Sequence, residues 1–175
     1  MSDARDHEAP DGPEPHDSAT VTVLVAADRD TCFRVFTEEI DQWWRRGLKY
    51  RIGRGRSVVH LEPRVGGALF ESFDTPSGTS KVVRTGTVLV CDPPARLVLE
   101  WRAVNFADDE RTEVEVRFDE SASGTRVTIV HRGFAKLRAD HPVRHGESAA
   151  VFVRRMGAWW GELATSLRAY ALDRE

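Results

Sequence analysis

The strongest constraint on the fold is a series of short, β-rich runs separated by marked turns. After a first run at 20–25, the runs that we interpret as strands cover residues 57–62, 68–74, 79–91, 95–104, 111–119 and 124–132. Gly, Pro, Asp and Ser gather between them, as in Asp92-Pro93-Pro94 and Ser121-Ala122-Ser123-Gly124. Successive strands joined by tight turns favour an antiparallel sheet.

Alternation within the last three runs assigns one face of the sheet to the core. The residues on this inward face are Leu97, Leu99, Trp101, Thr112, Val114, Val116, Phe118, Thr125, Val127, Ile129 and His131. The intervening positions are mostly charged, which predicts a solvated opposite face. His131 is either a core histidine bonded to a neighbour or a polar anchor for a ligand. Glu71 and Arg84 form a second candidate pair, either structural or ligand-orienting.

Two short helices are expected after the first strand, and one long helix near the C-terminus. Asp28 is a preferred N-cap residue, and apolar residues follow it at helical spacing through Trp43 and Trp44. Asp140-His141-Pro142 predicts the start of the long helix, because Pro favours the first helical position. Its apolar stripe comprises Phe152, Met156, Trp159, Trp160, Leu163, Leu167 and Tyr170. This order predicts an α+β fold in which a curved antiparallel sheet packs on the long helix.

Composition narrows the class of protein. A chain of 175 residues suits one domain, which we place at 19–175, after an acidic, Pro-rich tail at 1–18 that we expect to be disordered. A net charge of −3 gives no reason to expect nucleic acid or an anionic membrane as a partner. No apolar run approaches the ~20 residues of a membrane span. Without a signal-peptide pattern, and with only two cysteines, the expected location is the cytoplasm.

One connection between strands carries a more specific signature, Leu61-Glu62-Pro63-Arg64-Val65-Gly66-Gly67. Pro63 cannot donate to a central ladder, and the two glycines can adopt the positive φ of a tight hairpin. Trp43-Trp44 lies upstream, Gly86-Thr87-Val88 and Asp92-Pro93-Pro94-Ala95-Arg96-Leu97 lie downstream, and a Trp-rich helix follows. Over residues 20–172, this ensemble resembles the homologues of the activator of the heat-shock-protein-90 ATPase, which belong to the START-like (SRPBCC, helix-grip) superfamily.

The resemblance implies a helix-grip fold with a cavity between sheet and helix. By resemblance, the cavity lining would draw on Phe70, Val88, Leu99, Trp101, Val116, Ile129, Phe152, Met156 and Trp159, with Trp43 and Trp44 near the mouth. We add His131 as a polar member of this candidate ligand site. For each of these residues, ordinary core packing is the competing interpretation.

Catalytic and metal-binding patterns are not found in the sequence. Neither cysteine lies in a nucleophile motif, and the histidines lack the spacing of a metal site. We therefore expect no metal ion and no cofactor. The basic stretch from Arg45 to Arg56 could meet an anion or an acidic partner, although a solvated surface with local counter-charges is the more common case.

Three functional hypotheses follow. The first is non-enzymatic binding of an apolar or amphipathic small molecule in the cavity. The second is a chaperone-linked or stress-response role, which is doubtful because the eukaryotic activators' separate N-terminal domain could not fit within residues 1–18. The third is a polyketide cyclase or dehydratase-like enzyme in which His131, alone or with Arg84 or Glu71, acts as an acid or base or stabilises an enolate. A homodimer through exposed aromatic surface is compatible with the sequence, which does not require it.

Overall fold

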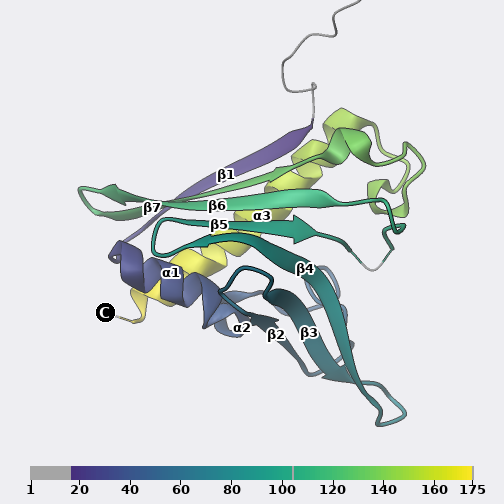
Figure 1. Ribbon diagram of the computed structural model, residues 1–175, viewed down its shortest axis with the longest axis horizontal. Coiled ribbons are helices and arrows are strands. Elements are labelled where there is room, and N and C mark those ends of the chain that lie inside the picture. Colours follow the sequence, from purple (N-terminus) through teal and green to yellow (C-terminus); the bar gives the residue numbers. More distant parts are fainter. Residues whose placement is uncertain (1–16, 104, 175) are drawn as a thin grey trace, which may run out of the picture.

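The protein folds into one curled antiparallel sheet packed against one long helix. The computed structural model describes residues 17–103 and 105–174 (Figure 1). Its strands are β1 (Ser18–Val25), β2 (Ser57–Leu61), β3 (Ala68–Asp74), β4 (Ser80–Asp92), β5 (Arg96–Trp101), β6 (Thr112–Ser121) and β7 (Gly124–Arg132). The helices are α1 (Arg29–Thr37), α2 (Ile40–Trp43) and α3 (Ala149–Leu172), with 3-10 turns η1 (Phe134–Lys136) and η2 (Pro142–Arg144). The predicted α+β helix-grip architecture is confirmed.

The seven strands form a single sheet in the order β1-β7-β6-β5-β4-β3-β2. Five of its six pairings join strands that follow one another along the chain. The sixth places β1 beside β7, with Val21 opposite Ile129. The chain then crosses from β1 to β2, the opposite edge, through α1 and α2 (Figure 1). This crossing places the two short helices and the loop after them beside α3.

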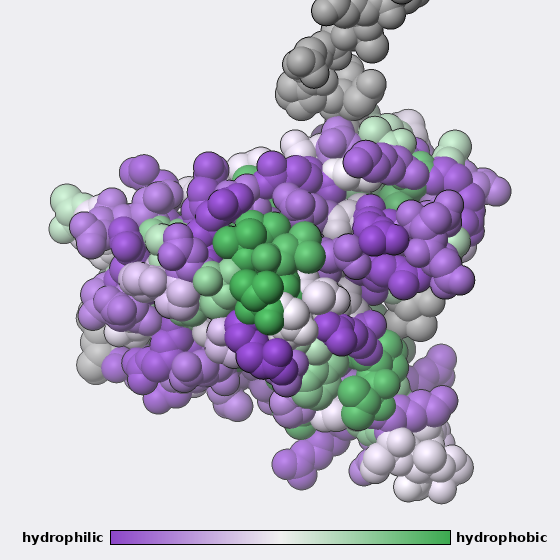
Figure 2. Space-filling view, viewed as in Figure 1, coloured by the Kyte–Doolittle hydropathy of each residue, from purple (hydrophilic) through white to green (hydrophobic). Residues whose placement is uncertain are grey.

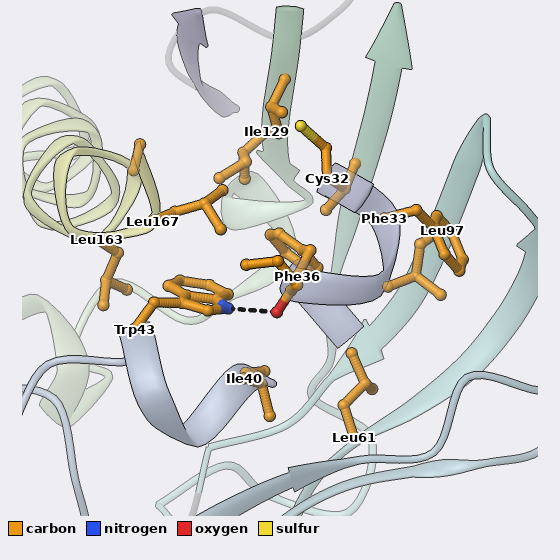
Figure 3. Close-up of a cluster of buried hydrophobic side chains, with 14 of the residues drawn as sticks. Cys32, Phe33, Phe36, Ile40, Trp43, Leu61, Leu97, Ile129, Leu163 and Leu167 are labelled. Atoms are coloured by element: carbon orange, nitrogen blue, oxygen red, sulfur yellow. Dashed lines mark hydrogen bonds between the residues drawn. The ribbon is translucent and has the colours of Figure 1, made fainter. Parts of the chain in front are cut away.

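The centre of the domain is filled by aromatic and aliphatic side chains from α1, α2, α3 and the sheet (Figure 3). Phe36 lies against Trp43, with 5.0 Å between ring centroids, and Leu163 and Leu167 approach them from α3. The Trp43 indole N–H donates to the carbonyl of Val35 at 3.0 Å, so its polar atom is satisfied inside the core.

The opposite face of the sheet is mainly polar. In Figure 1, β5 and β6 pass in front of α3, so Figure 2, viewed as in Figure 1, shows the face that turns away from this helix. Most of it is hydrophilic, with apolar patches between the charged groups. Glu115 of β6 accepts a hydrogen bond from Arg96 at 2.9 Å and also pairs with Arg132. Ion pairs between neighbouring strands therefore replace apolar packing on this side.

The long helix begins later than the sequence predicts. Pro142 opens the 3-10 turn η2, and α3 begins only at Ala149, after the N-cap residue Ser148. His145 and Gly146, at φ 49° and 74°, lie in the left-handed region, which interrupts a right-handed helical path. The predicted start at Asp140-His141-Pro142 is therefore wrong, because Pro is equally compatible with a short 3-10 turn.

The connection between β2 and β3 needs its two glycines for different reasons. Gly66 has φ +79°, and a Cβ there would meet open space. Gly67 has no such φ, but a Cβ there would lie 2.2 Å from the carbonyl oxygen of Glu62. Both glycines also bond to β4, because the Gly66 N–H donates to the Val88 carbonyl and the Gly67 carbonyl accepts from the Val88 N–H, each at 2.8 Å. The turn between β2 and β3 therefore also bonds to β4, a strand outside its own hairpin.

Alanine substitutions at these glycines should separate the two requirements. We expect Gly66→Ala to lower the free energy of unfolding by about 1–2 kcal/mol, the cost of a left-handed alanine. Gly67→Ala should cost more, about 2 kcal/mol or above, because backbone must move. Urea unfolding of both variants measures the difference. If both variants lost the same free energy of unfolding, the conclusion that Gly67 is needed for steric reasons would be contradicted.

Candidate functional site

A pocket of about 130 Å³ opens between the sheet, the loop after α2 and helix α3. Aromatic and aliphatic residues form most of its wall. The residues that line it are Trp44, Tyr50, Ile52, Val59, Leu69, Phe70, Glu71, Thr85, Trp101, Ala103 and Trp159. They come from the C-cap of α2, the 45–56 loop, strands β2 to β5, the chain just after β5, and α3. The pocket therefore lies at the β2–β5 side of the sheet.

All five tryptophans of the chain meet beside this pocket. Trp44 is the centre of the cluster, with ring centroids at 5.4 Å from Trp43, 5.8 Å from Trp159 and 6.0 Å from Trp160. Trp101 of β5 stacks on Trp44 at 6.4 Å. Such edge-to-face and offset contacts are the favoured aromatic geometries. The cluster joins α2, β5 and α3 through ring contacts.

Two tryptophans also hold the loop that covers the pocket. The Trp44 indole N–H donates to the carbonyl of Tyr50 at 3.0 Å, and that of Trp159 donates to the carbonyl of Lys49 at 2.9 Å. The Tyr50 ring stacks on Trp159, and the Lys49 ammonium bonds to Glu162 of α3 at 2.7 Å. The loop is therefore tied to α3 by an indole, a ring stack and an ion pair.

The same loop is held from within by Arg51, whose side chain is 1% exposed. All five guanidinium N–H groups have acceptors within 3.1 Å. They are the Asp41 carboxylate and the carbonyls of Asp41, Trp44, Arg45 and Ser57. The basic stretch is thus not uniformly a solvated surface, because one of its arginines is a buried connector.

Glu71 is the buried carboxylate of the pocket wall, with 5% of its surface exposed. Its oxygens accept from the backbone N–H groups of Ile52 at 2.8 Å and Gly53 at 2.9 Å. The expected pair with Arg84 does not form, because Arg84 is exposed and donates to the carbonyls of Gly86 and Gly66. A register shift between Leu69 and Phe70 alters the facing of β3 and β4 at this point.

His131 lies behind the tryptophan cluster, 2% exposed. The Trp160 indole N–H donates to its Nδ1 at 3.1 Å, so the proton of the neutral ring resides on Nε2. Nε2 lies 2.7 Å from the Thr112 hydroxyl oxygen and donates to it. Burial lowers the pKa of His131 from 6.5 to about 3. Both ring nitrogens are therefore committed to protein groups, as in a satisfied core histidine.

The twelve predicted site residues fall into two groups. Those that line the pocket are Trp44, Phe70, Trp101 and Trp159. The Phe70 ring also stacks on His60 of β2, with centroids 4.6 Å apart. Those placed in the packed interior or against it are Trp43, Val88, Leu99, Val116, Ile129, His131, Phe152 and Met156.

Other lining residues carry weaker sequence signals. Tyr50 and Ile52 lie in a stretch whose only visible pattern is basic charge and glycine, and Thr85 lies at a bulged position of β4. Nothing in the sequence around Arg51 marks it as a buried residue. The one feature that could have identified Tyr50 and Ile52 as lining residues is that they are an aromatic and an aliphatic residue shortly after the Trp43-Trp44 pair.

The match to a known family covers most of the chain. Residues 26–171 match the family described as activator of Hsp90 ATPase homolog 1-like protein. The chain belongs to this family. The match includes α1, α2, all but the last residue of α3, strands β2 to β7 and every residue of the pocket wall. No curated protein matches the chain.

Solved bacterial structures share the fold across nearly the full chain. A Cytophaga hutchinsonii protein has a TM-score of 0.63 at 12% identity, covering 90% of this chain and 94% of that one. A Rhodobacter sphaeroides protein reaches 0.60 at 19% identity, covering 94% and 97%. A Nitrosomonas europaea protein reaches 0.59 at 17% identity, covering 91% and 97%. At these identities, the likeness shows the START-like helix-grip fold alone.

Two further properties concern residues 17–103 and 105–174. None of the helices in these two ranges combines the length and apolar character that a membrane crossing requires. Among the same residues, no three His, Cys, Asp or Glu side chains come together as a metal-binding group.

Replacing Arg51 by Lys should test the buried connector. Lysine keeps the charge but has three donors instead of five, so buried acceptors lose partners. We expect the free energy of unfolding to fall by about 2–4 kcal/mol. The exposed Arg54→Lys, in the same loop, should change it by less than about 0.5 kcal/mol. Similar small effects in both variants, measured by urea unfolding, would show that Arg51 does not hold the loop.

The buried His131 should make the protein less stable as pH falls. Its folded pKa of about 3 lies below the ordinary value of 6.5, so the unfolded chain binds the extra proton between these values. This contribution is therefore fully present above pH 6.5 and is lost as pH falls toward about 3, by up to about 1.4 kcal/mol per pH unit. His131→Gln should flatten this dependence in urea unfolding across pH 4–7. An unchanged slope would contradict a neutral, buried His131.

Proposed function

We propose that this protein binds an apolar or amphipathic small molecule in the pocket bounded by Trp44, Tyr50, Trp101 and Trp159. The observation that carries the proposal is the pocket itself, a concave site lined by aromatic rings and fixed by bonds to the 45–56 loop. Concave, mostly apolar sites with a few placed polar groups are typical of small-molecule binding. Membership in a family with the helix-grip fold is consistent with this role.

The dimensions of the pocket limit the ligand. An apolar protein cavity on the order of 150 Å³ is large enough for benzene. At about 130 Å³, this pocket holds a group of similar size, or one end of a longer molecule that extends to solvent. Tyr50, Trp101, Ala103 and Trp159 are only partly buried, so the pocket wall reaches the surface.

An enzymatic role through His131 is less well supported by the same geometry. A general acid or base must reach the substrate and works best with a pKa near the operating pH. His131 has both ring nitrogens bonded to Thr112 and Trp160, and burial lowers its pKa to about 3. Binding without turnover therefore accounts better for the arrangement.

Native mass spectrometry of freshly purified protein is the direct test, followed by denaturation and extraction of any released compound. We expect a co-purified small molecule and one bound equivalent per chain. A clean apo mass, together with no stabilisation by any compound in a screen of small aromatic and aliphatic molecules, would count against the proposal. A chaperone or other protein partner would then be the hypothesis to pursue.

A pair of variants locates the bound molecule. Ala103→Phe places a large ring in the pocket wall, and we expect it to abolish the additional mass. Ala122→Phe makes the same change at an exposed position in the β6–β7 turn and should retain it. Equal binding by the two variants would place the ligand elsewhere.

A further inference from the structure

The lining residues of the pocket include an acidic side chain but no basic one. Glu71 is its only carboxylate, and no Lys, Arg or His belongs to the eleven lining residues given above. The Glu71 side chain is nearly buried, and each of its oxygens accepts one described backbone N–H bond. A carboxylate has about four acceptor positions, so acceptor capacity remains. The charged component of the pocket is therefore negative.

Five of the lining residues offer π-systems: Trp44, Tyr50, Phe70, Trp101 and Trp159. The faces of such rings carry negative potential and attract cations, with Trp the strongest. Cages of several aromatic rings recognise quaternary ammonium groups by this effect. Aromatic rings from the α2 C-cap and the loop after it, from the sheet and from α3, together with one carboxylate, make the pocket electrostatically suited to a cation as well as apolar.

Hydrogen-bonding capacity distinguishes among cations. A primary ammonium carries three donors that need acceptors once it is buried. The wall offers few acceptors for them: the free positions of Glu71, two of whose about four are used by backbone N–H groups, and the hydroxyls of Tyr50 and Thr85, the latter 3.5 Å from the Leu69 carbonyl. A methylated ammonium has no such donors to satisfy, and its methyl groups match the apolar wall.

We propose that the pocket selects a small organic cation of the quaternary ammonium type, alone or as the head of a larger molecule. This inference rests on the proposed binding function and names its ligand class. The volume of about 130 Å³ suits a trimethylammonium group, which is comparable in size to benzene. The aromatic rings contact the methyl groups, and Glu71 supplies the counter-charge.

Two protein cations lie close enough to compete. The Arg45 guanidinium and the Lys49 ammonium lie 5.3 and 5.4 Å from the centroid of the Tyr50 ring. Neither side chain lines the pocket, and Lys49 is neutralised by Glu162. The Tyr50 ring is thus within cation–π distance of two protein cations, while none of the eleven lining side chains is cationic.

Choline and its neutral carbon isostere, 3,3-dimethylbutan-1-ol, provide a matched test. The two have nearly the same shape and differ in charge. We expect choline to bind the full-length protein at least about tenfold more tightly in calorimetric titration, with a saturable change in tryptophan fluorescence. Equal or tighter binding of the alcohol would overturn selection for a cation while leaving the proposed binding function intact. Binding of neither probe would overturn the cation proposal, and the extraction experiment above would decide the general function separately.

Variants assign the selectivity to the pocket. Glu71→Gln should reduce the preference for choline over the alcohol by about tenfold, whereas Glu120→Gln, at an exposed position near the end of β6, should leave it unchanged. If Glu71→Gln fails to fold, Trp101→Leu gives a second reading, because it keeps an apolar side chain and removes the π-system. A preference that persists in every folded variant would overturn the assignment to these residues.

Discussion

The five hydrogen bonds of the buried Arg51 guanidinium hold together the segment that joins α2 to the pocket wall. Its five N–H groups join Asp41 and Trp44, at α2 and its C-cap, to the loop at Arg45 and to Ser57 at the start of β2. Burying a charge is costly unless it is paired and fully hydrogen-bonded, and here both conditions are met. Since Trp44 and Tyr50 lie on the segment that Arg51 holds, this side chain helps to place two of the aromatic residues of the wall.

The strands were predictable because their signal is local. Period-two alternation and turn residues locate β2 to β7 to within a few residues, and Asp28 caps α1 through a 2.7 Å bond from the Thr31 N–H as expected. The bonds of Arg51 are different in kind. Four of its five acceptors are main-chain carbonyls, which every residue type possesses, so no residue pattern marks them. The late start of α3 escaped prediction because left-handed His145 gives no reliable sequence signal.

The sequence also predicts which face of the sheet a residue occupies better than it predicts whether that residue is packed in the core or lines a pocket. Alternation correctly places Leu99, Val116 and Ile129 on the inner face, but it cannot say which inner positions the helices will cover. Side chains of α1 and α3, including Phe36, Leu163 and Leu167, fill the space beneath the centre of the sheet (Figure 3). Towards β2–β5, a loop rather than a helix closes part of the structure, and the pocket lies there. Inner-face residues that the helices cover therefore pack in the core, whereas those that the loop covers line the pocket.

Two buried ionisable groups near the tryptophans show how the site gains its polarity. His131 is the obvious polar candidate in the sequence, yet Trp160 and Thr112 use both of its nitrogens and burial keeps it neutral at ordinary pH. The sequence suggests Glu71 only as a partner of Arg84, but Glu71 lines the pocket and accepts hydrogen bonds from the backbone of Ile52 and Gly53 instead. The same carboxylate thus bonds to the 45–56 loop and is the acidic group of the aromatic pocket, so the order of the loop and the cation preference that we propose would share one physical origin.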